Sequence, residues 1–222
     1  MDNLIKRTIV GSIQLITGLG IMLFAPTWTF DYWQAWIYLF IFGSSVALIF
    51  IYLYKNDSKL LEGRLKRTEK EKSQKQVQFY IYFLYITLFV FSSLDHRFLW
   101  SNVPFLVVIG GDVLVSLGYL IIFIALKDNT FAAATIELTS DHKVISTGIY
   151  ALVRHPMYSG AIVLLLGTPL ALGSWWGLII FFLITYAIKV RLLDEEKFLS
   201  QNLTGYSEYC QKTQYRLMPF IW

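Results

Sequence analysis

Charged residues are scarce in this chain. They make up 15% of its 222 residues, whereas 56% are hydrophobic, and soluble domains usually carry about 25% charged residues. The single cysteine, Cys210, cannot form an intramolecular disulfide, so nothing indicates an oxidising compartment. The composition therefore argues against an ordinary soluble domain or a disulfide scaffold and favours a membrane protein.

Several motifs of soluble enzymes are also missing. The three histidines (His96, His142 and His155) and one distant cysteine give no zinc-binding pattern, so we expect no metal. The chain has no Walker-type loop, no Gly-x-Gly-x-x-Gly and no Gly-x-Ser-x-Gly. Its net charge is +4, but the basic residues lie beside apolar runs, which favours membrane topology over nucleic-acid binding.

Long apolar runs occupy most of the sequence. A helix rises about 1.5 Å per residue, so roughly 20 apolar residues cross the bilayer core. Four runs approach that length: Thr8–Ala25, Trp33–Tyr54, Val77–Leu94 and Val103–Leu126. The first follows basic residues, as in a secretory signal, but no small-x-small cleavage site comes after it. We therefore expect four transmembrane helices from these runs.

A fifth apolar stretch, Ala161–Val190, has 30 residues, which is too long for one span and short for two. Gly167-Thr168-Pro169 and Gly173-Ser174 interrupt it, and glycine and proline break helices. This pattern predicts a tight helical hairpin over residues 157–190 that turns near Leu172–Trp175. The expected fold class is therefore all-α: a polytopic membrane helix bundle with about six crossings.

The distribution of positive charge supports an even number of crossings. With six spans, one side of the membrane holds 18 of the 19 Lys and Arg residues, and the other side holds only Arg97. Cytoplasmic loops carry the excess of Lys and Arg. The sequence thus predicts an integral, multi-pass protein with both termini in the cytoplasm.

The chain divides into two expected regions. Residues 1–126 form an N-terminal four-helix transmembrane region, and residues 127–222 contain the hairpin and a cytoplasmic tail. The loop over residues 55–76 carries eight basic and four acidic residues. Its alternating charges predict a solvated helical connector that contacts anionic headgroups.

Polar residues gather on both sides of the hairpin. One cluster spans residues 140–160 and another spans residues 191–196, with further polar residues at 205–219. A hairpin returns the chain to the side where it entered, so these clusters meet at the cytoplasmic membrane face. Any one of these residues alone is more often a helix cap or a solvated side chain, but their convergence favours a functional site.

The start of the hairpin suits an anion. Pro156 fits the first turn of a helix, and free amides there, together with Arg154 and His155, could seat a carboxylate or phosphate. Glu195 and Glu196 could accept hydrogen bonds from a ribose or an amino group.

These residues form a recognisable pattern. The segment Gly148-Ile-Tyr-Ala-Leu-Val-Arg-His-Pro-Met-Tyr-Ser-Gly160 resembles the signature of the isoprenylcysteine carboxyl methyltransferase family, membrane enzymes related to phospholipid methyltransferases. The resemblance runs from about Asn129 to Pro219. It also includes His142, Gly167-Thr168, Glu195-Glu196, Tyr206, Tyr209 and Leu217. The first four spans match only as hydrophobic helices.

The resemblance implies the methyl donor S-adenosylmethionine and a set of residues that bind it. The residues implied to contact this cofactor are Val153, Arg154, His155, Tyr158, Glu195, Glu196, Tyr206, Tyr209 and Pro219. Either glutamate could hold the polar end of the cofactor, and the C-terminal Tyr and Pro segment would close over it. A lipophilic or lipidated acceptor would enter between helices from the membrane.

Methyl transfer from a sulfonium depends mainly on alignment and desolvation. A carboxylate acceptor is ionised at pH 7 and needs only a cation to orient it. Arg191 or Arg154 could supply that charge, and Arg191 is preferred. A thiol acceptor would need deprotonation, and His155 is the only obvious base. The sequence therefore favours a carboxylate or an easily ionised thiol.

Two alternatives remain open from the sequence. Membrane sterol reductases that use NADPH have a similar C-terminal region, although Glu195-Glu196 and the short N-terminal half favour the methyltransferase. A small transporter or scaffold would need polar residues near mid-membrane in several helices, and only Asp112 offers one.

Overall fold

The structure is a computed structural model and describes residues 2–65, 72–131 and 143–222. Every regular element within these ranges is helical, as the sequence predicts. The elements are α1 (Asp2–Thr27), α2 (Trp33–Asn56), α3 (Ser58–Leu65), α4 (Lys72–Phe98), α5 (Phe105–Asp128), the 3₁₀ turn η1 (Gly148–Ala151), α6 (Pro156–Ala171), α7 (Gly177–Asn202) and α8 (Tyr206–Lys212).

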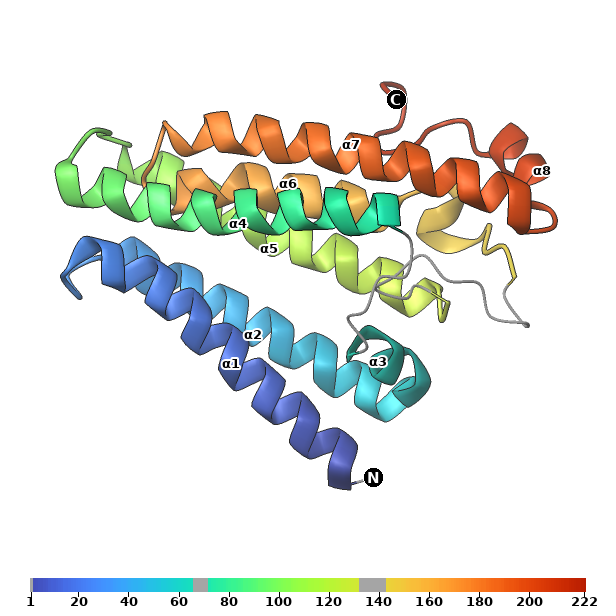
Figure 1. Cartoon of the computed structure of the whole chain (residues 1–222), viewed down its shortest axis with the longest axis horizontal. Coiled ribbons are helices and arrows are strands. Elements are labelled where there is room, and N and C mark those ends of the chain that lie inside the picture. The colour runs from blue at the N-terminus through green and yellow to red at the C-terminus, as the bar shows by residue number, and fades with distance from the viewer. Residues whose placement is uncertain (1, 66–71, 132–142) are drawn as a thin grey trace.

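The long helices run between two ends of the molecule. The connections α1–α2, α4–α5 and α6–α7 lie at one end, and α3, η1, α8 and both termini lie toward the other (Figure 1). Helices α1, α2, α4 and α5 are long and apolar enough to cross a membrane, and α6 is a shorter apolar helix. The predicted polytopic helical bundle is confirmed, whereas its orientation in the membrane remains a prediction.

The predicted hairpin is formed by α6 and α7. Helix α6 ends at Ala171 and α7 begins at Gly177, so the turn falls where the sequence predicts it. Gly173 adopts a φ of +72°, which glycine tolerates without a steric penalty. The Ser174 hydroxyl accepts a hydrogen bond from the Gly177 amide at 3.0 Å and donates one to Asp95 at 2.5 Å. These bonds fix the turn against the end of α4.

Helices α5 and α6 approach each other closely because glycines face each other. A Cβ atom at Gly118 would lie 2.6 Å from the Gly160 carbonyl oxygen, and one at Gly167 would lie 2.6 Å from the Gly111 carbonyl oxygen. Such contacts leave no space for a side chain, so the backbones pack directly, as small residues allow in membrane helix pairs. This packing places the start of α6 beside the end of α5.

The loop after α2 differs from the sequence-based expectation. Rather than only a solvated connector, it contains α3, whose Leu60 and Leu61 are buried against Leu53 and Leu126. These leucines hold α3 against α2 and α5, because the free energy gained by burying their apolar side chains exceeds the cost of keeping the charged loop beside the bundle. The most charged part of the loop, residues 66–71, lies outside the described residues.

Candidate functional site

The segment between α5 and α6 orients the signature residues. Gly148 adopts a φ of +59°, and the Asp128 carboxylate accepts a hydrogen bond from the Ile149 amide at 3.0 Å. Pro156 occupies the first turn of α6, where its missing N–H costs nothing. Pro156 thus begins the helix as the sequence predicts, and Arg154 and His155 lie directly before it.

The C-terminal segment pairs with this entry. The Arg154 amide donates to the Tyr215 carbonyl and the His155 amide donates to the Arg216 carbonyl, both at 2.9 Å. The Ser159 hydroxyl donates to the Leu217 carbonyl at 2.6 Å. These bonds hold the start of α6 against the C-terminal segment. The anion seat expected at this helix start remains a prediction.

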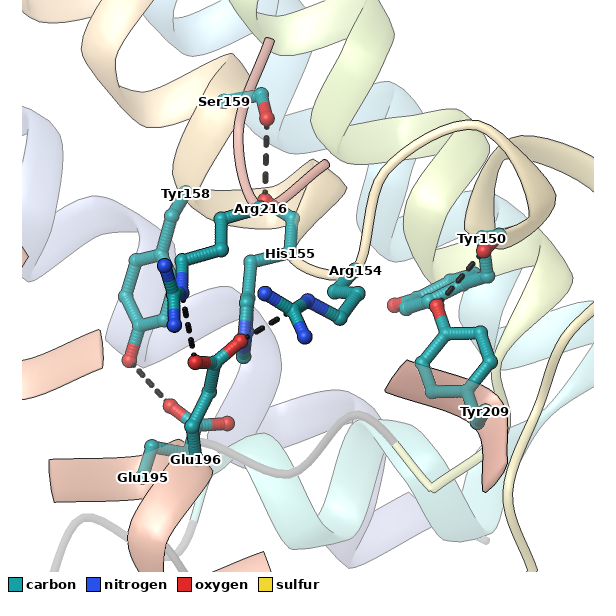
Figure 2. A network of polar contacts seen from close by, with 9 residues as sticks. All are labelled: Tyr150, Arg154, His155, Tyr158, Ser159, Glu195, Glu196, Tyr209 and Arg216. Carbon is teal, nitrogen blue, oxygen red and sulfur yellow. Dashed lines mark hydrogen bonds and ion pairs between the residues drawn. The ribbon is translucent and has the colours of Figure 1, made fainter. Parts of the chain in front are cut away.

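Glu196 lies at the centre of a basic cluster (Figure 2). Its Oε2 accepts a hydrogen bond from Arg216 Nε at 2.7 Å, and its Oε1 lies 3.2 Å from His155 Nε2 and 3.1 Å from Arg154 Nε. Burial alone would raise the pKa of Glu196, but the hydrogen bonds from His155 and Arg216 and the nearby positive charges lower it to about 2. Glu196 is thus a fixed anion that joins α7, the start of α6 and the C-terminal segment.

Glu195 belongs to a second polar network. Its Oε2 accepts a hydrogen bond from the Tyr158 hydroxyl at 2.6 Å, and that hydroxyl accepts one from Arg191 Nε at 3.1 Å. Arg191 also donates from Nη1 to Gln78 Oε1. The network therefore links α7, α6 and α4.

One cavity of about 620 Å³ adjoins this network. At its polar end it is lined by signature and tail residues: Arg154, His155, Tyr158, Glu195, Tyr206 and Tyr209. Towards the membrane core it is lined by apolar and aromatic side chains, two from each of four helices: Ile81 and Tyr85 on α4, Tyr119 and Ile122 on α5, Leu164 and Leu165 on α6, and Ile184 and Ile188 on α7. A ligand with a polar end and a lipophilic end would match this gradient.

Two tyrosines of α8 meet the polar end of the cavity. The Tyr209 hydroxyl donates to the Tyr150 carbonyl at 2.7 Å. The Tyr206 hydroxyl is buried and has no hydrogen-bond partner among the described residues. Buried hydroxyls are normally paired, so Tyr206 offers a hydrogen bond to a molecule in the cavity. This donor and the nearby Glu195 carboxylate, which lines the same cavity, fit a polar cofactor such as S-adenosylmethionine.

The other residues expected to bind cofactor lie elsewhere. As far as the described residues define the cavity, Val153, Glu196 and Pro219 are not part of its lining. Val153 is buried, Glu196 is engaged in the basic cluster and Pro219 is exposed. His142, a motif residue, lies outside the described residues.

Sequence reasoning missed three polar residues of the cavity wall. Arg64 on α3, and Gln78 and Tyr82 on α4, line the same cavity. Gln78 and Tyr82 are four residues apart and so share a helix face. That spacing was the only available signal, because a glutamine at the end of an apolar span usually faces headgroups.

Comparisons with known proteins agree with the signature. The phospholipid methyltransferase family matches residues 106–204. A protein of Oryza sativa subsp. indica named "Probable protein-S-isoprenylcysteine O-methyltransferase" is 30% identical over 135 residues, which cover 60% of this chain and 68% of the relative. The protein-S-isoprenylcysteine O-methyltransferase of Schizosaccharomyces pombe is 36% identical over 69 residues, 31% of this chain and 25% of the relative.

A reductase is also similar, over a shorter share of its length. A delta(14)-sterol reductase of Mus musculus is 25% identical over 91 residues, which cover 40% of this chain and 22% of the relative. The methyltransferase of rice matches more of this chain, and at higher identity, than the reductase does.

Proposed function

The chain belongs to the isoprenylcysteine carboxyl methyltransferase family of membrane methyltransferases, and from this premise we propose that it methylates the carboxylate of a lipophilic acceptor at the cytoplasmic membrane face. The acceptor would be an S-prenylcysteine or another isoprenoid or lipid acid, since the relatives are named for isoprenylcysteine. The observation that carries this proposal is the cavity that joins the polar signature residues to an apolar interior.

The polar end of the cavity would hold the cofactor. Tyr206 offers its buried hydroxyl, and Glu195, with Tyr158 hydrogen-bonded to it, offers a carboxylate to amino or ribose groups. His155 and Arg154 line the same end. When bound there, S-adenosylmethionine would supply a sulfonium methyl group, which forms a C–O bond with the acceptor as the C–S bond breaks and sulfur keeps the electron pair.

The acceptor's charge would be met by Arg191. The described residues of the cavity wall include four cations (Arg64, Lys143, Arg154 and Arg191) but one carboxylate, Glu195. This excess favours an anionic acceptor over a neutral one. Arg191 is buried in the cavity wall, and Tyr158 and Gln78 accept hydrogen bonds from its guanidinium, so we assign the acceptor carboxylate to Arg191. An ionised carboxylate needs no base, and His155 is engaged with Glu196.

The cofactor is tested by calorimetric titration of the detergent-solubilised protein with S-adenosylhomocysteine. We expect saturable one-to-one binding by the wild type. His155→Ala removes the ring that contacts Glu196 and lines the cavity. Binding should weaken by at least about tenfold, because a change of this size corresponds to the loss of one or more hydrogen bonds to charged groups.

The matched control is His96→Ala, which also loses a hydrogen-bonded ring but at the opposite end of the bundle. It should bind S-adenosylhomocysteine as the wild type does. Binding of NADPH in place of S-adenosylhomocysteine would contradict the proposal and move the protein to the reductases. Equal binding by wild type and His155→Ala would refute the site.

A further inference from the structure

Gln78 on α4 lies in the cavity wall, outside the residues 106–204 that match the phospholipid methyltransferase family. Its amide is held at both ends. The oxygen Oε1 accepts a hydrogen bond from Arg191 Nη1, and the nitrogen Nε2 donates to the Tyr82 hydroxyl at 2.8 Å. Because a guanidinium only donates hydrogen bonds, the amide oxygen is the end that faces Arg191, and the Nε2 end is left to the Tyr82 hydroxyl.

Arg191 is itself buried, with 8% of its surface exposed. Its guanidinium is planar, so hydrogen bonds from two of its nitrogens fix both its position and its plane. Nε donates to Tyr158 on α6 and Nη1 donates to Gln78 on α4. Helix α4 thus supplies one support of this cation, and α6 supplies another.

We propose that Gln78 is a positioning residue, which holds the Arg191 guanidinium in the orientation that receives the acceptor's carboxylate. This inference rests on the proposed function. A glutamine suits the role because a neutral amide orients the guanidinium without cancelling its charge, whereas a glutamate would pair with Arg191 and repel an anionic acceptor. Part of the acceptor specificity would then reside in α4, outside the family signature.

The charge argument predicts a selective effect of Gln78→Glu. The glutamate can still accept a hydrogen bond from Arg191, so the contact is kept while a negative charge is added. We expect the KM for N-acetyl-S-farnesylcysteine to rise about tenfold or more, because like charges side by side cost several kcal/mol. The inhibition constant of the corresponding carboxamide should stay within about twofold of its wild-type value, because the carboxamide has no charge. The Kd of S-adenosylhomocysteine should also stay within about twofold of its wild-type value, which is far less than the roughly 1.4 kcal/mol of a tenfold change.

Gln78→Leu removes the contact instead. We expect kcat/KM for N-acetyl-S-farnesylcysteine to fall about 10- to 100-fold, since a small misplacement of a positioning group has an effect of this size. Binding of S-adenosylhomocysteine should be retained. The matched controls are Gln76→Glu and Gln76→Leu, because Gln76 is an exposed glutamine on the same helix; both should behave as the wild type.

The outcomes separate the two proposals. If the wild type methylates the carboxylate but Gln78→Glu weakens the carboxylate and the carboxamide equally, Gln78 has a structural role only and the inference is wrong. It is also wrong if both Gln78 variants match the Gln76 controls. If the wild type neither binds S-adenosylhomocysteine nor methylates the carboxylate, the proposed function fails and the inference falls with it.

Discussion

At the scale of single residues, Glu195 and Glu196 are neighbours in the sequence but have different surroundings. Glu196 contacts Arg154, His155 and Arg216, which come from the start of α6 and the C-terminal segment. Glu195 contacts Tyr158 and lines the cavity. Adjacent residues on a helix point about 100° apart, so one side chain can stabilise the fold while the other meets a ligand.

This difference predicts that the same substitution affects stability at Glu196 and ligand binding at Glu195. Glu196→Gln leaves three basic groups without their anion, and breaking a buried ion pair costs about 3 kcal/mol or more; we expect a clear drop in the melting temperature in detergent. Glu195→Gln should keep the melting temperature but weaken S-adenosylhomocysteine binding about tenfold, the loss of one hydrogen bond to a charged group. Differential scanning fluorimetry and calorimetry measure the two effects.

The pH dependence provides a check on Glu196. Folding lowers its pKa from 4.5 to about 2, so its contribution to stability is complete above about pH 4.5 and is lost as the pH falls toward 2. The difference in melting temperature between wild type and Glu196→Gln should be constant from pH 5 to pH 7. It should shrink by about half between pH 5 and pH 3. A difference as large at pH 3 as at pH 5 would show that another interaction of Glu196 is responsible.

At the scale of elements, the sequence predicted the long helices and the hairpin because each is a run of apolar residues with clear breaks. The hairpin turn near Leu172–Trp175 was correct because Gly173 and the preceding proline are local signals. The burial of α3 and the pairing of the tail with Arg154 and His155 were not predicted. Both depend on contacts between residues far apart in the chain, which leave no periodic trace in a single sequence.

The close contact between α5 and α6 can be tested with one methyl group. A Cβ atom at Gly118 would lie 2.6 Å from backbone atoms of Gly160 and Leu164, so Gly118→Ala must push the helices apart. We expect a loss of about 1–3 kcal/mol of stability, seen as a lower melting temperature. Weaker S-adenosylhomocysteine binding should accompany it, because α5 and α6 both line the cavity.

Gly110→Ala is the matched control for this experiment. It lies on the same helix, and a Cβ atom there meets nothing within 4 Å. Alanine is also the better helix former, so this variant should be at least as stable as the wild type. Equal stability of Gly118→Ala and Gly110→Ala would show that the helix contact is looser than the structure has it.

At the scale of the whole molecule, the division into residues 1–126 and 127–222 remains a prediction, but the cavity draws on both regions. Gln78, Tyr85 and Tyr119 come from the first region and Glu195 and Tyr206 from the second. The family signature indicated only the second set, because its motifs lie in that region. The proposed acceptor's side of the cavity is built from residues whose proximity is visible only in the three-dimensional structure.

The orientation of the molecule can be tested with its single cysteine. Both termini and α8 lie toward one end of the bundle (Figure 1), and Tyr206 and Tyr209 of α8 line the polar end of the cavity. The excess of Lys and Arg at this end predicts that it is cytoplasmic. A membrane-impermeant maleimide should therefore label Cys210 only after spheroplasts are permeabilised.

In a Cys210→Ser background, Gln201→Cys should behave in the same way, since both positions follow the apolar part of α7. Asn102→Cys, in the α4–α5 connection at the opposite end, should be labelled in intact spheroplasts. Labelling of Gln201→Cys in intact spheroplasts, with Asn102→Cys protected, would invert the topology and place the methyl-transfer site on the outer face.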